Sequence, residues 1–421
     1  MAQHFRPEER PKSKKRVIII TVIAVIVTAA LVVGGILIWA NFFVQPNIDP
    51  PPYQEAVQQA VLTEAPTEAP TEAPTESPAQ SYLDTMSERE KICQLFIVKP
   101  ETLQGGSEVT VVDETAKATL EEYPVGGVMA LADNLEDADQ TTTMLSTFQS
   151  YSKTPLFLAV DEEGGDVSRC AEKLGTTEFQ SMYSYKDEGE TVAHDNAKTI
   201  AEDISQFGFN LDFAPVADVW TNPDNTVIST RAYSDDYSQA SELVSSAVKG
   251  FHDGGILCTL KHFPGHGNTT EDSHDGLAYV SETVDELKSG ALLPFQSGIQ
   301  AGADMVMVGH LMVEDVDPDL PATLSPKVVP QLLRQELGYD GVTITDSMGM
   351  GAITDNYSYS EIVKGIFDAD IDLILSPENL SEYVTAIEEG LKDGSLTQEQ
   401  LDQKVLRILT LKYEKGIIPT E

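Results

Sequence analysis

Eight short apolar, β-rich segments recur along this 421-residue chain between amphipathic, helix-like segments. Strands that alternate with helices favour a parallel sheet, and eight is the number of strands that closes a (β/α)8 barrel. Because the segments are apolar almost without interruption, they fit a sheet that is buried on both faces. The sequence therefore predicts an α/β fold, a TIM-type barrel. The eight predicted strands are Ile92–Val98, Gly127–Leu131, Leu156–Asp161, Phe209–Pro215, Ile256–His262, Met305–His310, Val342–Asp346 and Leu373–Ser376.

The segments between and after these strands predict helices. Their apolar residues recur with helical rather than alternating spacing. The predicted helices are Glu136–Tyr151, Thr191–Phe207, Tyr237–His252, Val284–Ala301, Lys327–Leu337, Leu380–Lys392 and Gln398–Tyr413.

The part of the chain before the barrel predicts a membrane anchor and a spacer. Residues 1–16 form a basic tail, and residues 17–44 carry no charge over a length that can cross a bilayer. An uncleaved signal anchor with the tail in the cytoplasm follows from the position of the basic residues. Residues 45–80 are rich in Pro, Thr and Glu and predict a disordered linker. We expect a single-pass protein of the cell membrane whose catalytic barrel, residues 81–421, is extracytoplasmic.

The charge of the chain excludes nucleic acid as a partner. The net charge is −41, and the basic tail contributes +4, so the rest carries −45. Such a surface repels polyanions at a distance. The three cysteines are too few and too scattered for a disulfide framework or a zinc site, and Cys258 lies in an apolar segment. No catalytic metal or other cofactor is indicated, and the sequence predicts no oligomeric state.

Polar residues stand where the predicted strands end. Asp161, Lys261, His262, His310 and Asp346 each lie at the carboxyl end of an apolar segment. In a closed barrel that end is the active-site face, so five such residues from four strands indicate one site. For Asp346 alone, the alternative is an N-cap of the next helix.

The loop after the fifth strand is dense in proton-transfer groups. It runs from Lys261 as KHFPGHG and continues to Asp272-Ser273-His274. A carboxylate beside an imidazole can fix its tautomer, as a general acid/base requires. The alternative for Asp272 and His274 is a solvated turn. His266 is predicted to be structural.

Six motifs follow one another along the chain. They are Gly126-Gly127-Val128 with Asn134, Leu158-Ala159-Val160-Asp161 through Glu163-Gly164-Gly165 and Arg169, Phe213-Ala214-Pro215-Val216-Ala217-Asp218-Val219, Thr230-Arg231-Ala232-Tyr233, KHFPGHG with Asp272-Ser273-His274, and Gly341-Val342 through Asp346-Ser347-Met348. Together these segments resemble family 3 glycoside hydrolases of the β-N-acetylglucosaminidase branch, over about Ser87 to Lys415. The resemblance implies Asp346 as the nucleophile and His274, oriented by Asp272, as the general acid/base. It implies that Asp161, Arg231, Lys261 and His262 hold the hydroxyls of the terminal sugar.

The resemblance implies a retaining exo-β-N-acetylhexosaminidase that removes N-acetylglucosamine from cell-wall-derived oligosaccharides, muropeptides or other amino-sugar glycans. The alternatives are a β-glucosidase or xylosidase, a phosphorylase of the same family, and a non-catalytic domain that binds wall glycans. The Asp-x-His element favours the first reading, and only about 75 residues follow Asp346 to supply an acid from a further domain. Asp166, Ser168 and Ser347 depart from the family pattern, and Asp166 bears on sugar preference.

Overall fold

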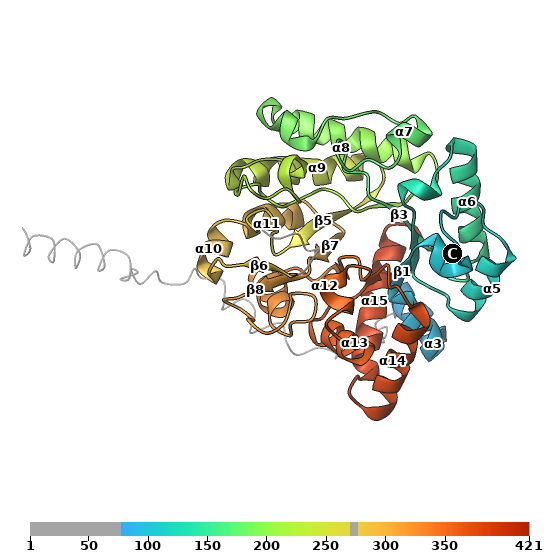
Figure 1. Cartoon of the computed structure of the whole chain (residues 1–421). Coiled ribbons are helices and arrows are strands. Elements are labelled where there is room, and N and C mark those ends of the chain that lie inside the picture. Colours follow the sequence, from blue (N-terminus) through green and yellow to red (C-terminus); the bar gives the residue numbers. More distant parts are fainter. Residues whose placement is uncertain (1–76, 270–276, 421) are drawn as a thin grey trace, which may run out of the picture. The chain divides into compact units, whose positions relative to one another are not determined.

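Eight parallel strands form the centre of the protein (Figure 1). The computed structural model describes residues 77–269 and 277–420. Each of the eight predicted apolar segments overlaps one of these strands, so the predicted alternation is confirmed. The strands are β1 (Phe96–Val98), β2 (Gly127–Met129), β3 (Phe157–Val160), β4 (Leu211–Asp212), β5 (Leu257–Phe263), β7 (Met305–Val308), β9 (Val342–Thr345) and β10 (Ile374–Leu375).

The strand order closes the sheet on itself. Neighbours run β10-β1-β2-β3-β4-β5-β7-β9, and every pair is parallel. The two ends of this order, β9 and β10, meet through a parallel bridge between Ile344 and Leu373, where the Thr345 N–H donates to the Leu373 carbonyl at 2.9 Å. The result is a nearly closed barrel of eight parallel strands, as the predicted TIM-type fold requires.

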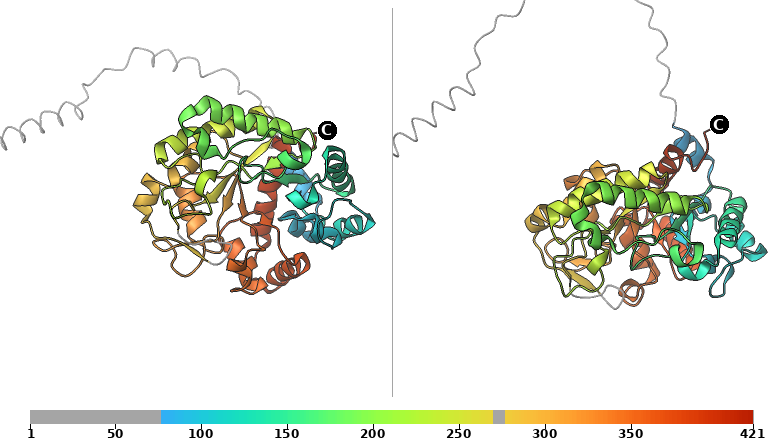
Figure 2. Two further views of the ribbon diagram at one scale, coloured as in Figure 1. Left: turned by 45° about the horizontal axis from the view of Figure 1, so that its top comes forward. Right: turned by 90° about the horizontal axis from the view of Figure 1, so that it is seen from above.

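Helices surround the barrel strands, and Figure 2 shows them outside the sheet. Several begin where a short polar side chain accepts from backbone N–H groups: Asp137 caps α6 and Asp236 caps α9. The helices are α2 (Pro78–Thr85), α3 (Glu88–Gln94), α4 (Pro100–Gln104), α5 (Glu114–Glu122), α6 (Ala138–Tyr151), α7 (Ala171–Leu174), α8 (Glu190–Ser205), α9 (Tyr237–Asp253), α10 (Val284–Ser289), α11 (Leu292–Gln300), α12 (Gly351–Thr354), α13 (Tyr359–Asp368), α14 (Leu380–Asp393) and α15 (Gln398–Glu414), with a π-helix at Val329–Glu336.

The structure differs from the predicted elements in three places. Residues 92–94 belong to helix α3 rather than to the first strand, because Ser87 and Glu90 form a capping box that starts a helix there. The predicted helix Val284–Ala301 is divided into α10 and α11, which separate at Gly290. The short parallel pair β6 (Ala278–Val280) and β8 (Leu311–Val313) was not predicted.

The N-terminal predictions lie mostly outside the described residues. Helix α2 begins at Pro78, so the last residues of the predicted linker 45–80 are helical. In residues 77–269 and 277–420, no helix has the length and apolar character needed to cross a membrane. The predicted tail 1–16 and anchor 17–44 fall outside these ranges.

Candidate active site

One pocket of about 250 Å³ lies at the carboxyl ends of the barrel strands. Its lining residues end or follow β1, β2, β3, β5, β9 and β10, which places it on the face where (β/α)8 barrels carry their active sites. Four of the five strand-end residues that predicted the site line it, and so does Arg231: these residues are Asp161, Lys261, His262, Asp346 and Arg231. The lining consists of Lys99, Met129, Leu131, Asp161, Glu163, Val167, Arg169, Val227, Arg231, Lys261, His262, His266, Met307, Asp346, Ser347, Leu375 and Ser376.

Lys261 is the centre of a buried ion-pair network. Its Nζ lies 2.7 Å from Asp161 Oδ1 and 2.6 Å from Glu163 Oε1. Burial lowers the pKa of a lysine, but the two carboxylates outweigh this effect and raise the pKa of Lys261 above its ordinary value. The ammonium therefore stays charged in the pocket wall.

Glu163 links this ammonium to Arg231. The Arg231 guanidinium donates from Nε and Nη2 to the two Glu163 oxygens, each at 2.8 Å. Burial would raise the pKa of Glu163, but Lys261 and Arg231 hold it far below its ordinary value. Glu163 therefore stays ionised and is not a proton donor. Glu163 stands in one of the motifs, but its ion pairs with Lys261 and Arg231 were not predicted from the sequence.

Arg169 is a second residue whose role sequence analysis missed. Its side chain lines the pocket, and its Nε is buried with no hydrogen-bond partner among the described residues. The backbone is fixed because the N–H groups of Arg169 and Cys170 donate to the Glu162 carboxylate at 2.6 and 2.8 Å. A buried donor without a partner in the pocket wall is suited to bind a polar ligand.

Asp218 orients the two histidines of the KHFPGHG segment. Its carboxylate accepts from His262 Nδ1 at 2.7 Å and from the backbone N–H groups of His262 and His266 at 3.0 and 2.6 Å. Burial would raise the pKa of Asp218, but the charge of His262 and its hydrogen bond lower the pKa. With Nδ1 bonded to Asp218, the imidazole of His262 has a fixed orientation at the pocket. Asp218 and His262 are 44 positions apart in the sequence, so their hydrogen bond could not be predicted from a local motif.

His266 is buried, and its ring and its carbonyl group both contact other residues of the protein. It is 1% exposed, its Nδ1 lies 2.7 Å from the Thr269 hydroxyl, and its carbonyl accepts from Asn225 at 2.8 Å. The next residue, Gly267, has no space for a Cβ, which would lie 1.9 Å from the Val219 carbonyl oxygen. The loop is therefore pressed against the chain after β4.

Asp346 follows β9 and enters the same pocket. Its N–H donates to the Val308 carbonyl at 2.9 Å, and its Oδ1 accepts from the Ser347 N–H at 2.7 Å. Burial would raise the pKa of Asp346, but the charges of His262 and His310, with the Ser347 N–H, lower the pKa below its ordinary value. The result is an ionised carboxylate. His310 does not line the pocket; its Nε2 lies 3.1 Å from the Ser347 carbonyl.

The predicted acid/base residues lie outside the described part of the chain. Asp272 and His274 fall in residues 270–276, between the two described ranges 77–269 and 277–420. Their roles remain predictions from the sequence.

The comparisons with known proteins identify the family. Residues 87–411 match the family model described as "Glycosyl hydrolase family 3 N terminal domain". The chain belongs to glycosyl hydrolase family 3. It is therefore a glycoside hydrolase, and the resemblance inferred from its motifs is confirmed.

Three proteins that are similar to this chain carry the name β-hexosaminidase or β-N-acetylglucosaminidase. The chain is 33% identical to Beta-hexosaminidase A of Pseudoalteromonas piscicida, over 72% of this chain and 56% of that protein. It is 31% identical to Beta-hexosaminidase LpqI of Mycobacterium tuberculosis, over 78% and 83%. The structure of a family 3 β-N-acetylglucosaminidase from Paenibacillus sp. FPU-7 superimposes with a TM-score of 0.74 at 33% identity, over 80% of this chain and 64% of that chain. The chain thus spans only part of two of these relatives.

Replacement of Glu163 and replacement of Arg169 should affect the stability of the protein to very different extents. Glu163→Gln leaves the buried Arg231 without its ion-pair partner and Lys261 with Asp161 alone, so the free energy of unfolding should fall by roughly 3 kcal/mol or more. Arg169→Gln should change it by less than about 0.5 kcal/mol, because the Arg169 Nε has no partner to lose. Chemical denaturation of both variants measures the difference. Equal effects would contradict the assignment of Glu163 as the charge that holds the network together.

Proposed function

We propose that this protein is a retaining exo-β-N-acetylhexosaminidase that removes terminal N-acetylglucosamine through a covalent glycosyl-Asp346 intermediate. The observation that carries the proposal is the ionised carboxylate of Asp346 in a small pocket lined by charged hydrogen-bonding side chains. The names of the relatives, β-hexosaminidase and β-N-acetylglucosaminidase, support the sugar class.

Asp346 is the nucleophile in this proposal. An ionised carboxylate attacks the anomeric carbon, and the glycosidic bond breaks as the ester bond to Asp346 forms. The other carboxylates of the pocket, Asp161 and Glu163, are both in ion pairs with Lys261, and Glu163 is paired with Arg231 as well. They are therefore engaged in holding the pocket together. Asp346 has no ion pair within the described part of the chain; its Oδ1 accepts from the Ser347 N–H, and the carboxylate is available for attack.

The proton donor in this proposal is His274, oriented by Asp272. Retaining glycosidases usually use a second carboxyl group about 5–5.5 Å from the nucleophile. Glu163 is held ionised here, and that argues for a donor from another part of the chain. His274 gives its proton to the leaving oxygen in the first step. In the second step it takes a proton from water, which attacks the anomeric carbon and releases Asp346.

The sugar is held by charged side chains on the pocket wall. Asp161, Lys261 and His262 offer an acceptor and donors to hydroxyl groups, as the resemblance implied. Arg231 and Arg169, whose side chains line the same pocket, add guanidinium donors. A pocket of about 250 Å³ suits one terminal ring rather than the interior of a chain, which supports exo-action.

The natural substrates that we propose are amino-sugar oligosaccharides or muropeptides derived from the cell wall. The basic residues before the uncharged segment 17–44, and the Pro-rich segment after it, support a single-pass anchor in the cell membrane with the barrel outside. A barrel on a long spacer can reach wall fragments close to the membrane.

Replacement of the two catalytic residues tests the mechanism. Asp346→Ala should lower hydrolysis of nitrophenyl β-N-acetylglucosaminide by about a thousandfold or more, because no ester intermediate can form. His274→Ala should slow mainly the second step, since nitrophenol leaves without a proton. Azide should therefore rescue His274→Ala and give the β-glycosyl azide. The control is Asp203→Asn, a residue of helix α8. Equal activity of wild type and both variants would refute the proposal, and sugar binding without turnover in the wild type would favour a non-catalytic domain.

The pH profile identifies the donor. With an unactivated alkyl glycoside, kcat/KM should fall as the pH rises through the pKa of His274, ordinarily about 6.5, because the deprotonated imidazole cannot donate. The low pKa of Asp346 keeps it ionised down to acidic pH, so it should add no inflection above about pH 4. His274→Glu should move the alkaline limb to lower pH. An unchanged limb would exclude His274 as the donor.

A further inference from the structure

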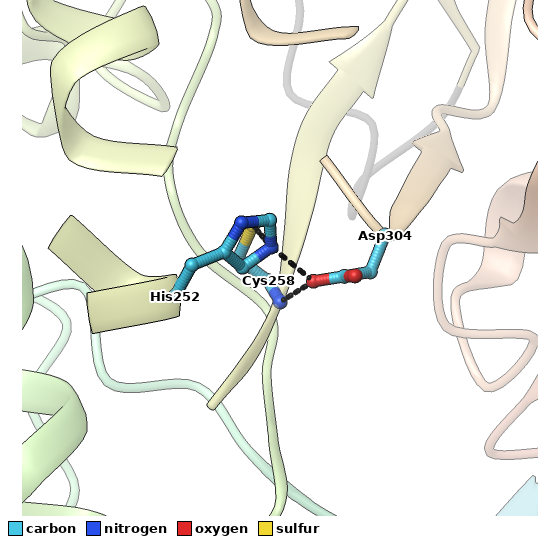
Figure 3. Close-up of side chains that lie close together, drawn as sticks. All are labelled: His252, Cys258 and Asp304. Atoms are coloured by element: carbon cyan, nitrogen blue, oxygen red, sulfur yellow. Dashed lines mark hydrogen bonds and ion pairs between the residues drawn. The ribbon is translucent and has the colours of Figure 1, made fainter. Parts of the chain in front are cut away.

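Three potential metal ligands meet at the end of the barrel opposite the active site. His252 lies in the last turn of α9, Cys258 is the second residue of β5, and Asp304 immediately precedes β7. The amino ends of β5 and β7 therefore bring together residues from three elements (Figure 3). No step of the proposed hydrolysis uses them.

The three ligand atoms converge on one point. His252 Nε2 lies 2.8 Å from Asp304 Oδ2 and 4.0 Å from Cys258 Sγ, and all three atoms lie within 4.8 Å of one another. In a Cys-His-Asp nucleophilic relay, the thiol and the carboxylate contact different ring nitrogens. Here the same nitrogen faces both groups, so the arrangement is not such a relay.

The spacing is close to that of a tetrahedral zinc site. Zinc binds imidazole nitrogen at about 2.0–2.1 Å, carboxylate oxygen at about 2.0–2.2 Å and thiolate sulfur at about 2.3 Å. Tetrahedral angles then place nitrogen and sulfur about 3.6 Å apart and nitrogen and oxygen about 3.4 Å apart. The distances here are 4.0 and 2.8 Å. Side-chain shifts of roughly half an ångström would bring both of these pairs to tetrahedral spacing.

We propose that Cys258 Sγ, His252 Nε2 and Asp304 Oδ2 bind one divalent transition-metal ion of the zinc class, with water as the fourth ligand. The thiol proton is released to solvent when the sulfur-metal bond forms, and the imidazole proton moves from Nε2 to Nδ1. Thiolate, imidazole and carboxylate together suit Zn²⁺ and its substitute Co²⁺ rather than Mg²⁺ or Ca²⁺.

The surrounding residues orient the carboxylate for this role. The Cys258 N–H donates to Asp304 Oδ2 at 2.9 Å, which leaves one lone pair of that oxygen for the metal. Lys415 Nζ lies 2.6 Å from the other oxygen, Oδ1, so the ammonium holds the carboxylate without occupying the metal position. The Tyr339 hydroxyl donates to the Asp304 carbonyl at 3.0 Å. Hydrogen bonds of this kind position metal ligands in proteins.

An ion can reach the site from solvent. The His252 side chain is 28% exposed, although those of Asp304 and Cys258 are buried. Asp304 also lines a surface hollow of about 470 Å³, together with Gly341, Val342 and Leu411. Two anionic ligands neutralise the charge of a divalent ion.

The proposed site joins separate parts of the fold. A bound ion would link α9 to the starts of β5 and β7, and Lys415 extends the connection to the end of α15. Because the amino-end face of a barrel serves stability rather than catalysis, the ion should stabilise the domain.

Cobalt binding to the full-length chain, stripped of metal with a chelator, tests the proposal. We expect one equivalent of Co²⁺ to produce a thiolate-to-cobalt charge-transfer band, which Zn²⁺ displaces. Cys258→Ser should abolish the band, and His252→Gln should weaken Co²⁺ binding at least tenfold. The matched control is Cys93→Ser, a buried free cysteine of the core, which should keep the band.

The effect of Zn²⁺ on the Tm provides a second test that does not depend on the charge-transfer band. Zn²⁺ should raise the Tm of wild type and Cys93→Ser but not of Cys258→Ser or His252→Gln. If Cys258→Ser does not fold, His252→Gln decides, because its side chain is partly exposed. No charge-transfer band in the wild type, or a band and a Tm shift that persist in the variants, would overturn the proposal.

Discussion

The ammonium of Lys261, buried between Asp161 and Glu163, is the interaction on which the rest of the site depends. Glu163 also forms an ion pair with Arg231, so two cations and two carboxylates from three segments are held in one network. Loss of a partner from a buried pair costs about 3–5 kcal/mol, which makes the arrangement stiff. The strand that carries Lys261 also places His262 at the pocket, where Asp218 sets its orientation.

This network also separates the roles of the carboxylates. Glu163 is held ionised by two cations and serves to position them, whereas Asp346 is held ionised by His262 and His310 but has no salt bridge among the described contacts. Asp346 can therefore react while its neighbours bind. Because Glu163 is held ionised, it does not donate the proton, and in our proposal the segment with Asp272 and His274 supplies it.

The sequence predicted the barrel and the strand-end residues because both follow from local patterns. Apolar segments identify buried strands, and a polar residue such as Asp346 at a strand end is visible without tertiary information. The helical conformation of residues 92–94 was not predicted because these apolar residues continue directly into the strand, whereas the capping box that starts the helix precedes them. Glu163, Arg169 and Asp218 were missed as functional residues, since their roles depend on partners distant in sequence. The same applies to His252, Cys258 and Asp304, which come from three elements.

The most direct test of the central claim is to trap the intermediate. A fluorinated N-acetylglucosaminyl fluoride should form the glycosyl-enzyme faster than water releases it, and mass spectrometry of the digested protein then locates the sugar. The account predicts one equivalent of label on the peptide that contains Asp346, with β-configured product from the normal substrate. Label on another residue, or product of inverted configuration, would contradict it.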